Sequence, residues 1–234
     1  MLDDAAATLR LRCDEAGLDI VHPFCLDWFN DDAEPSMRLP DWGRRDALGF
    51  VIGNTRRLWP VFARALRDEP TLLDVEHPLD AYVERELTAA ATSALTERHV
   101  VLFAHRMTPA PIAIQRVAHA SGLAHLSPSR LSVHSEYGPW LALRAVVVVD
   151  ADGPPGDRPR AHDPCTPCSK PCLAAFDRAM GVTDLARPGD VEREWKSWAE
   201  VREVCPEGKL SRYGDDQLRY HYAKDRSILR LLVR

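Results

Sequence analysis

The chain has 234 residues, a net charge of −5 and 45% hydrophobic residues, which suits one large domain, or a domain with an appended subdomain, and excludes a disordered chain. No run of Lys and Arg offers a basic face, so a nucleic-acid-binding protein is not expected. The acidic start Met1-Leu2-Asp3-Asp4 is unlike a signal peptide, and no apolar stretch reaches the roughly 18 residues of a membrane span, so we expect a cytoplasmic protein without membrane contact.

Helices and strands alternate irregularly along the first 150 residues. Apolar residues at helical spacing predict helices over 3–16, 58–66, 77–94 and 109–120. Short apolar runs between turn residues predict strands over 18–24, 47–52, 99–104, 131–134 and 140–149, with a loop over 31–45. Some strands follow one another without a helix between them. This order predicts an α+β fold with a mostly antiparallel sheet flanked by helices.

The turn Gly53-Asn54-Thr55 lies between a predicted strand and a predicted helix. Free backbone N–H groups at such a helix start can hold an anionic group of a ligand. The commoner role is capping of the helix by the side chain of Asn54 or Thr55, and we favour that interpretation.

The composition changes after residue 150. Residues 150–164 are rich in Pro, Gly, Asp and Arg, which predicts a linker across the surface. Helices are predicted over 173–180, 191–204 and 215–233. We therefore expect a main domain over 1–150 and a small helical C-terminal subdomain over 151–234.

Three of the six cysteines are crowded together with the spacing C-x2-C-x3-C: Cys165, Cys168 and Cys172. Thiolates at this spacing can converge on one Zn²⁺ or on an iron–sulfur cluster. For the fourth ligand, Cys205 is the first candidate and His162 the second. Redox-active thiols without a metal and plain structural cysteines are the alternatives. Cys13 and Cys25 are isolated and are expected in the core.

Five ordered segments carry a family resemblance. They are Val21-His22-Pro23-Phe24 followed by Trp28-Phe29-Asn30, residues 49–66, His77-Pro78-Leu79-Asp80 with Tyr82, Ala118-His119-Ala120-Ser121-Gly122, and Val133 through Arg144 to Val149. In this order they resemble the cobalamin-processing family of the cblC type, which are cyanocobalamin reductases and alkylcobalamin dealkylases. The resemblance covers residues 10–150 well and 160–232 weakly. The chain departs from it at His125 and Leu126, because animal members carry a row of tyrosines there.

The resemblance implies a nitroreductase-like fold in which residues 1–150 bind cobalamin with its lower base detached. It implies a corrin site formed by His119, Ser129, Ser132, His134, Tyr137 and Trp140. It assigns Arg144 as the catalytic residue, which would clamp the carboxylates of a thiol co-substrate such as glutathione. On the residues alone, Arg144 could face solvent on an antiparallel strand, His119 could be a packed or surface histidine, and Trp140 suits the core as well as a pocket wall.

The expected function is that of an oxidoreductase that binds base-off cobalamin and removes its upper axial ligand. Cyanide would leave after one-electron reduction of cobalt by reduced flavin or by a cluster at the cysteines, and an alkyl group would leave by attack of a thiolate. A cobalamin module followed by clustered cysteines is similar to the order in reductive dehalogenases and epoxyqueuosine reductase, where iron–sulfur clusters feed electrons to cobalt. The alternatives are a non-catalytic cobalamin carrier and a flavin-dependent nitroreductase-like oxidoreductase. A homodimer is also considered.

Overall fold

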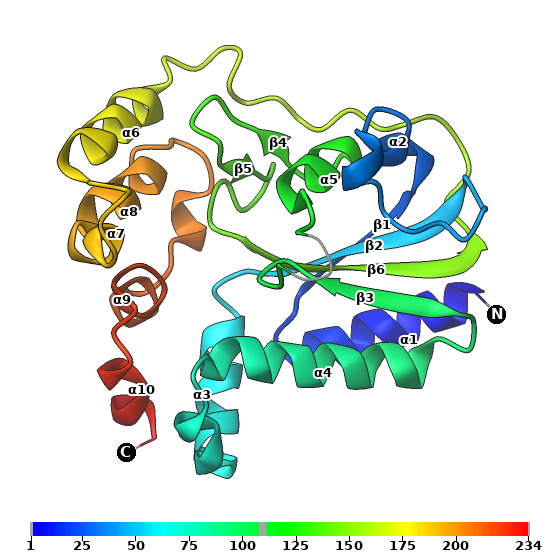
Figure 1. Cartoon of the computed structure of the whole chain (residues 1–234), viewed down its shortest axis with the longest axis horizontal. Coiled ribbons are helices and arrows are strands. Elements are labelled where there is room, and N and C mark those ends of the chain that lie inside the picture. The colour runs from blue at the N-terminus through cyan, green and yellow to red at the C-terminus, as the bar shows by residue number, and fades with distance from the viewer. Residues whose placement is uncertain (1, 108–110, 234) are drawn as a thin grey trace.

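The computed structural model of the chain describes residues 2–107 and 111–233. At its centre lies a four-stranded sheet of β1 (Ile20–Cys25), β2 (Ala47–Asn54), β3 (His99–Phe103) and β6 (Ala142–Asp152), in the order β1-β2-β6-β3 (Figure 1). Each pair of neighbouring strands is antiparallel. The predicted antiparallel sheet is thereby confirmed, and each of these strands overlaps a predicted one.

The two central strands are apolar because both faces of the sheet are covered. Every residue of β2 is buried, and so are residues 145–149 of β6. Phe50 lies opposite Val147, and both side chains belong to the core on one face. Val51 and Val146 belong to the core on the other face. Because burial of such a side chain contributes about 1.5–3 kcal/mol, the two strands form the stable centre of the domain.

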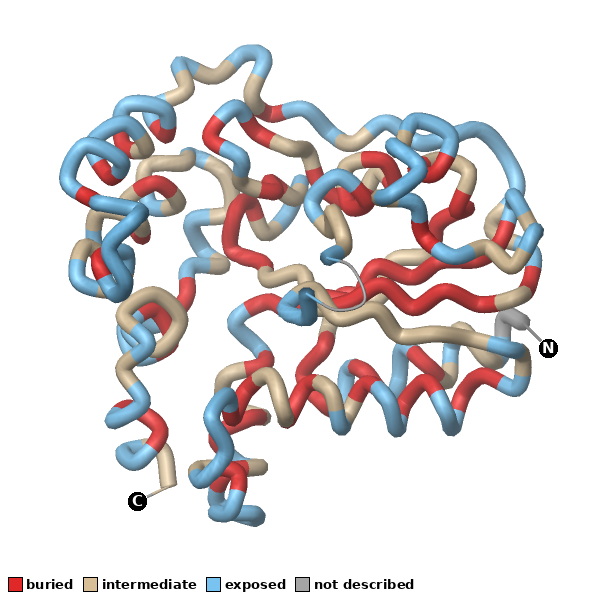
Figure 2. The backbone as a smooth tube through the Cα atoms, in the orientation of Figure 1, coloured by how far each residue is buried: buried red, intermediate tan, exposed pale blue. Residues whose placement is uncertain are grey.

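Helices cover both faces of the sheet. One face carries α1 (Leu2–Glu15), α3 (Leu58–Asp68) and α4 (Pro78–Ala94) (Figure 1). The other carries α2 (Asp27–Asn30), α5 (Ile114–Ala120) and a small hairpin of β4 (His125–Leu126) and β5 (Ser132–Val133). Buried residues follow the sheet and the inner sides of these helices (Figure 2). The predicted helical cover of the sheet is confirmed.

The C-terminal part begins with an extended segment. Residues 153–170 form no helix or strand and run past α5, in agreement with the predicted linker (Figure 1). The helices that follow are α6 (Pro171–Val182), α7 (Asp190–Arg193), α8 (Trp195–Glu203), α9 (Asp215–Ala223) and α10 (Ser227–Leu232). The single predicted helix over 215–233 is wrong, because Lys224 adopts a left-handed φ of 52° that ends α9. The helix predicted over 191–204 is likewise divided at Glu194.

Several short elements were not predicted. They include α2, β4 and single 3₁₀ turns at Pro35–Met37, Pro70–Asp74 and Lys209–Ser211. The strand expected over 131–134 is reduced to β5, and His134 instead forms an isolated bridge to Gly138. The helix expected over 109–120 begins at Ile114, and residues 109 and 110 lie outside the described residues. Elements this short contain too few residues to show a periodic pattern.

The C-terminal helices pack on the main domain. Leu229 of α10 joins the core beside α3, and Trp140, which precedes β6, packs against Tyr213 and Leu218. β6 itself continues to Asp152, beyond the expected domain boundary at residue 150. Among the described helices, none has the length and apolar character needed to cross a lipid bilayer.

Candidate functional site

Three adjoining cavities surround α5 and the β4–β5 hairpin. Their volumes are about 190, 460 and 290 Å³. The first two share Arg116 and Leu126, and the last two share Ile114 and Gln115. The three cavities therefore adjoin one another, and we call them together the α5 groove.

The α5 groove has apolar walls and cationic edges. Apolar side chains come from α5, from its flanks and from the segment that leads into β6: Ile112, Ile114, Leu126, Leu141 and Leu143. Four arginines also line the groove, Arg116, Arg130, Arg158 and Arg202, and Arg158 pairs there with Asp32. Such a surface suits a large apolar ligand that carries polar or anionic groups.

Two of the predicted corrin-site residues line the α5 groove. His119 accepts a hydrogen bond at Nδ1 from the backbone N–H of Leu126 at 3.3 Å, and its ring lies edge-on to that of His125 with 5.5 Å between centroids. Ser132, on β5, is buried, and its Oγ has no hydrogen-bond partner among the residues that the structure describes. An unpaired buried polar group is unfavourable by about 1–3 kcal/mol. Ser132 is therefore the clearest polar contact point for a ligand.

Arg144 occupies an irregular position in β6. Ile52 pairs with Ala145, whereas the next residue, Gly53, pairs with Leu143, so Arg144 is the extra residue of a β-bulge. A bulge changes the direction of the side chains around it. Here the side chain of Arg144 is only 13% exposed. The alternative in which Arg144 faces solvent is therefore wrong.

The guanidinium of Arg144 has one strong partner and one free donor. Its Nε–H donates to Oδ1 of Asn54 at 2.7 Å, and Nη1 lies 3.8 Å from Oδ1 of Asp80. The side chain of Asn54 thus holds Arg144 and does not cap α3, while Thr55 Oγ1 accepts the N–H of Arg57 at 3.2 Å. Nη2 of Arg144 is buried without a partner in the described part of the chain. Burial lowers the pKa of Arg144, yet a guanidinium stays charged near neutral pH, so Nη2 can bind an anion.

A polar cluster that the sequence did not predict, with Tyr213 buried and the others half-buried, lies around Arg144. It contains Arg202, Tyr213 and His221. Arg202 donates from Nη1 to the carbonyl oxygen of Pro139 at 2.8 Å and also lines the α5 groove, while its Nε has no partner among the described residues. Burial, with Arg144 and Arg202 nearby, lowers the pKa of His221 well below its usual value. Arg202 therefore lies near Arg144 and also in the wall of the α5 groove.

The remaining predicted corrin-site residues lie elsewhere. His134 and Tyr137 stack on each other with 4.7 Å between ring centroids, in the turn before β6. Trp140 is 1% exposed and packs edge-on against Tyr213, so it is a core residue. Ser129 is buried and lines a separate cavity at the cysteines. The structure thus distributes the predicted corrin set over the groove, the turn, the core and the cysteine cavity.

The four cysteines predicted as metal ligands come together in the structure. Cys165, Cys168, Cys172 and Cys205 line one small cavity of about 20 Å³, which we call the cysteine cavity. All four thiols are free. Burial raises the pKa of Cys165 to about 11, and Asp163 and the other three cysteines add to this rise. His162, the second candidate for the fourth ligand, does not line the cysteine cavity.

A more compact group of metal-binding side chains overlaps the cysteine cavity. The ligand atoms of His125, Asp163 and Cys165 all lie within 4.8 Å of one another, and Nε2 of His125 is 3.3 Å from Oδ1 of Asp163. Within the described residues, no other three His, Cys, Asp or Glu ligand atoms come so close together. Of the four cysteines, only Cys165 belongs to this group.

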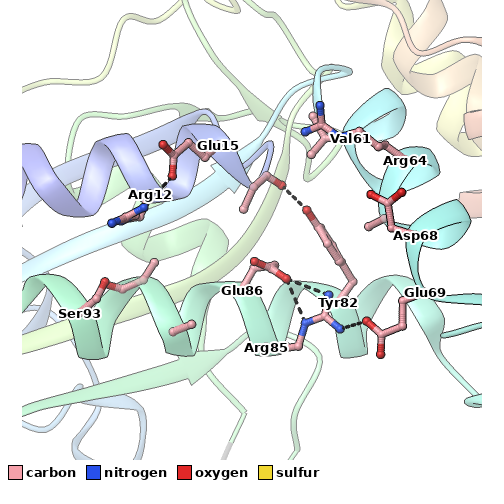
Figure 3. Close-up of a pocket in the computed structure, with 14 residues that line it drawn as sticks. Arg12, Glu15, Val61, Arg64, Asp68, Glu69, Tyr82, Arg85, Glu86 and Ser93 are labelled. Carbon is pink, nitrogen blue, oxygen red and sulfur yellow. Dashed lines mark hydrogen bonds and ion pairs between the residues drawn. The ribbon is translucent and has the colours of Figure 1, made fainter. Parts of the chain in front are cut away.

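The largest of the described cavities, about 540 Å³, lies on the other side of the sheet between α1, α3 and α4 (Figure 3). Most of the charged side chains in its wall pair with one another. Arg85 pairs with Glu69 and Glu86, and Arg12 pairs with Glu15. Because these charges satisfy each other, we assign the candidate site to the α5 groove.

Curated proteins related to this chain are found along most of its length. The mouse cyanocobalamin reductase / alkylcobalamin dealkylase is 24% identical over 218 residues, which cover 86% of this chain and 72% of the mouse protein. The human protein of the same name is 23% identical over 218 residues, covering 86% and 71%. The chicken protein is 21% identical over 231 residues, covering 91% and 89%. No family model matches the chain.

A solved structure is similar over the whole chain. It is the crystal structure of a C. elegans protein described as the B12-trafficking protein CblC, with a TM-score of 0.76 and 18% sequence identity. The alignment covers 100% of this chain and 97% of the C. elegans chain, so the two proteins share a fold. The resemblance to the cblC-type family, expected from the sequence, is confirmed by these relatives.

Proposed function

We propose that this chain is an enzyme that binds cobalamin in the α5 groove and removes its upper axial ligand. The observation that carries the proposal is the similarity, over 86% or more of the chain, to proteins named cyanocobalamin reductase / alkylcobalamin dealkylase. The apolar walls and the arginines of the α5 groove support it.

The chemistry of the α5 groove suits a cobalamin. The corrin ring is largely apolar, carries amide arms and is joined to its nucleotide tail through a phosphodiester. We assign Leu141 and Leu143 to the ring, the unpaired Oγ of Ser132 to an amide arm, and Arg116 and Arg130 to the phosphodiester. We further propose that cobalamin binds with its lower base detached, because a vacant lower position eases the entry of an electron at cobalt.

Two reactions follow for such a complex. In dealkylation, the thiolate of glutathione attacks the alkyl carbon, the Co–C bond breaks, its electron pair stays on cobalt, and a thioether forms. In decyanation, one electron from reduced flavin converts Co(III) to Co(II), and cyanide leaves. Arg144 would hold a carboxylate of glutathione through its free Nη2, with Arg202 adding positive charge beside it.

The test is turnover by the purified full-length protein. Methylcobalamin with glutathione should yield S-methylglutathione and reduced cobalamin, and cyanocobalamin with reduced flavin should yield free cyanide and Co(II) cobalamin. Binding of cobalamin without formation of either product would show that the chain is a non-catalytic cobalamin carrier. The absence of both binding and turnover would overturn the proposal.

A further inference from the structure

The pairing of two helices brings distant cysteines together. α6 and α8 pack side by side through Ala175, Ala179 and Val201 (Figure 1). Cys172 lies in the first turn of α6, and Cys205 lies two residues beyond the end of α8. Both cysteines line the cysteine cavity, so the start of one helix and the end of the other meet there.

The loop before α6 supplies the other two cysteines in a fixed arrangement. The carboxylate of Asp163 accepts the backbone N–H of Cys165 at 2.8 Å, and the N–H of Cys168 donates to the carbonyl oxygen of Cys165 at 3.3 Å. The backbone N–H of Lys170 donates to Sγ of Cys168 at 3.3 Å. Hydrogen bonds from backbone N–H groups to sulfur stabilise thiolate ligands and tune the metal centres that they bind.

We propose that Cys165, Cys168, Cys172 and Cys205 hold an iron–sulfur cluster. Four thiols around one small gap provide the ligand number of a metal centre. The rest of the cavity wall is mostly apolar and rigid, with a proline beside each of three cysteines: Pro164, Pro171 and Pro206. The inference rests on these residues and does not depend on cobalamin binding.

The spacing of the cysteines in the sequence favours a cluster over a single zinc ion. Cys165, Cys168 and Cys172 have the spacing C-x2-C-x3-C, which also ends the cysteine run of bacterial ferredoxins. Structural zinc sites usually take their cysteines from separate C-x2–4-C pairs. Here three of the four thiols come from one such run, and only Cys205 comes from a distant part of the chain.

The cysteine cavity and the α5 groove share one short strand. Val133 of β5 lines the cysteine cavity, whereas its neighbour Ser132 lines the α5 groove. Consecutive strand residues point to opposite sides, so β5 separates the two cavities. The proposed cluster would therefore lie next to the groove and not at a remote surface.

Iron and acid-labile sulfide analysis of the full-length protein, purified without oxygen or reconstituted with ferrous iron and sulfide, tests the proposal. We expect a brown protein with about four iron atoms and four sulfides per chain and a paramagnetic signal after reduction. Zinc without iron, or no metal after reconstitution, would overturn the proposal whatever the variants do.

Variants identify the ligands. Cys172→Ser and Cys205→Ser should each lose most of the iron. Cys13→Ala, which removes a buried thiol on α1, should retain it. His125→Ala should also retain the iron, because His125 belongs to the compact group with Asp163 and Cys165 and not to the four thiols. Loss of iron in His125→Ala with retention in Cys205→Ser would contradict the proposed ligand set.

Discussion

Arg144 and Asn54 are joined by a hydrogen bond of 2.7 Å from Nε to Oδ1, at the bulge where β6 loses register with β2. Asn54 is fully buried, and its amide group also donates to the carbonyl oxygen of Thr55 at 2.8 Å. These two bonds fix the position of Asn54 and hence the orientation of the guanidinium. Nη2 of Arg144 is left buried and without a partner among the described residues.

Arg144→Lys should raise the KM for glutathione in dealkylation about 10- to 100-fold, because an ammonium group cannot keep the bond to Asn54 and also bind a carboxylate in the same geometry. The estimate corresponds to loss of one hydrogen bond between charged groups, about 1.5–3 kcal/mol. Steady-state kinetics with varied glutathione measure this change. Flavin-driven decyanation, which uses no thiol, should be retained.

The matched control is Arg85→Lys, which replaces an arginine that is paired with Glu69 and Glu86 on the other side of the sheet. It should leave both reactions unchanged. An equal loss of dealkylation and decyanation in Arg144→Lys would show that Arg144 acts on the structure alone, and the assigned thiol contact would then be wrong.

Ser132→Ala should have opposite effects on stability and on binding. Removal of the buried, unpaired hydroxyl should raise the free energy of unfolding by up to about 1 kcal/mol. The hydroxyl of Ser132 loses its hydrogen bonds to water when the chain folds and gains none in return, and alanine avoids this cost. Loss of the contact to an amide arm of cobalamin should weaken binding about fivefold, as expected for one hydrogen bond of about 1 kcal/mol. Urea unfolding and cobalamin titration measure the two effects. Unchanged affinity would remove Ser132 from the site.

Gly138 and Gly208 pack back to back and attach the turn before β6 to the segment after Cys205. A Cβ on Gly208 would lie 2.1 Å from the carbonyl oxygen of Tyr137, and both glycines have positive φ. Gly208→Ala should therefore lower the free energy of unfolding by about 2–4 kcal/mol, through left-handed strain and overpacking together. Gly43→Ala, where φ is also positive but nothing lies within 4 Å, should lower it by only about 1–2 kcal/mol. Equal losses in chemical denaturation would contradict the close packing.

His221 should make the protein sensitive to acid. Burial first, and then Arg144 and Arg202, hold the pKa of His221 well below its usual value, so the folded state keeps it neutral. The unfolded chain takes up a proton there below pH about 6.5, so the free energy of unfolding falls as the pH drops from this value towards the folded pKa. Relative to wild type, His221→Gln should gain up to about 1.4 kcal/mol per pH unit below pH 6.5. Parallel stability curves for the two proteins between pH 5 and 7.5 would contradict this burial.

The sheet could be predicted because its central strands are continuous apolar runs between turn residues, as in 47–52 and 145–149. The end of α9 could not be predicted. Lys224 ends the helix in the left-handed conformation, whereas a Gly or Asn usually occupies such a position and signals the helix end in the sequence. The direction of Arg144 depends on the register between β2 and β6. A bulge of this kind is a property of two paired strands and leaves no pattern in either one alone.

The candidate site was predictable in part. The spacing of Cys165, Cys168 and Cys172 correctly placed three thiols together, and Cys205 joined them as expected. Arg202 was missed, although it lies four residues after Trp198 on α8 and helical spacing puts both on one side. The compact group of His125, Asp163 and Cys165 was not predicted, since it joins residues that lie far apart in the sequence.

Titration of aquocobalamin and cyanocobalamin with purified protein, followed by visible absorption, tests whether the chain binds cobalamin in the base-off form. We expect a saturable shift of the corrin bands to those of the base-off form, equal in wild type and Arg85→Lys and weaker in Ser132→Ala. A cobalamin spectrum that stays unchanged at excess protein would contradict this expectation.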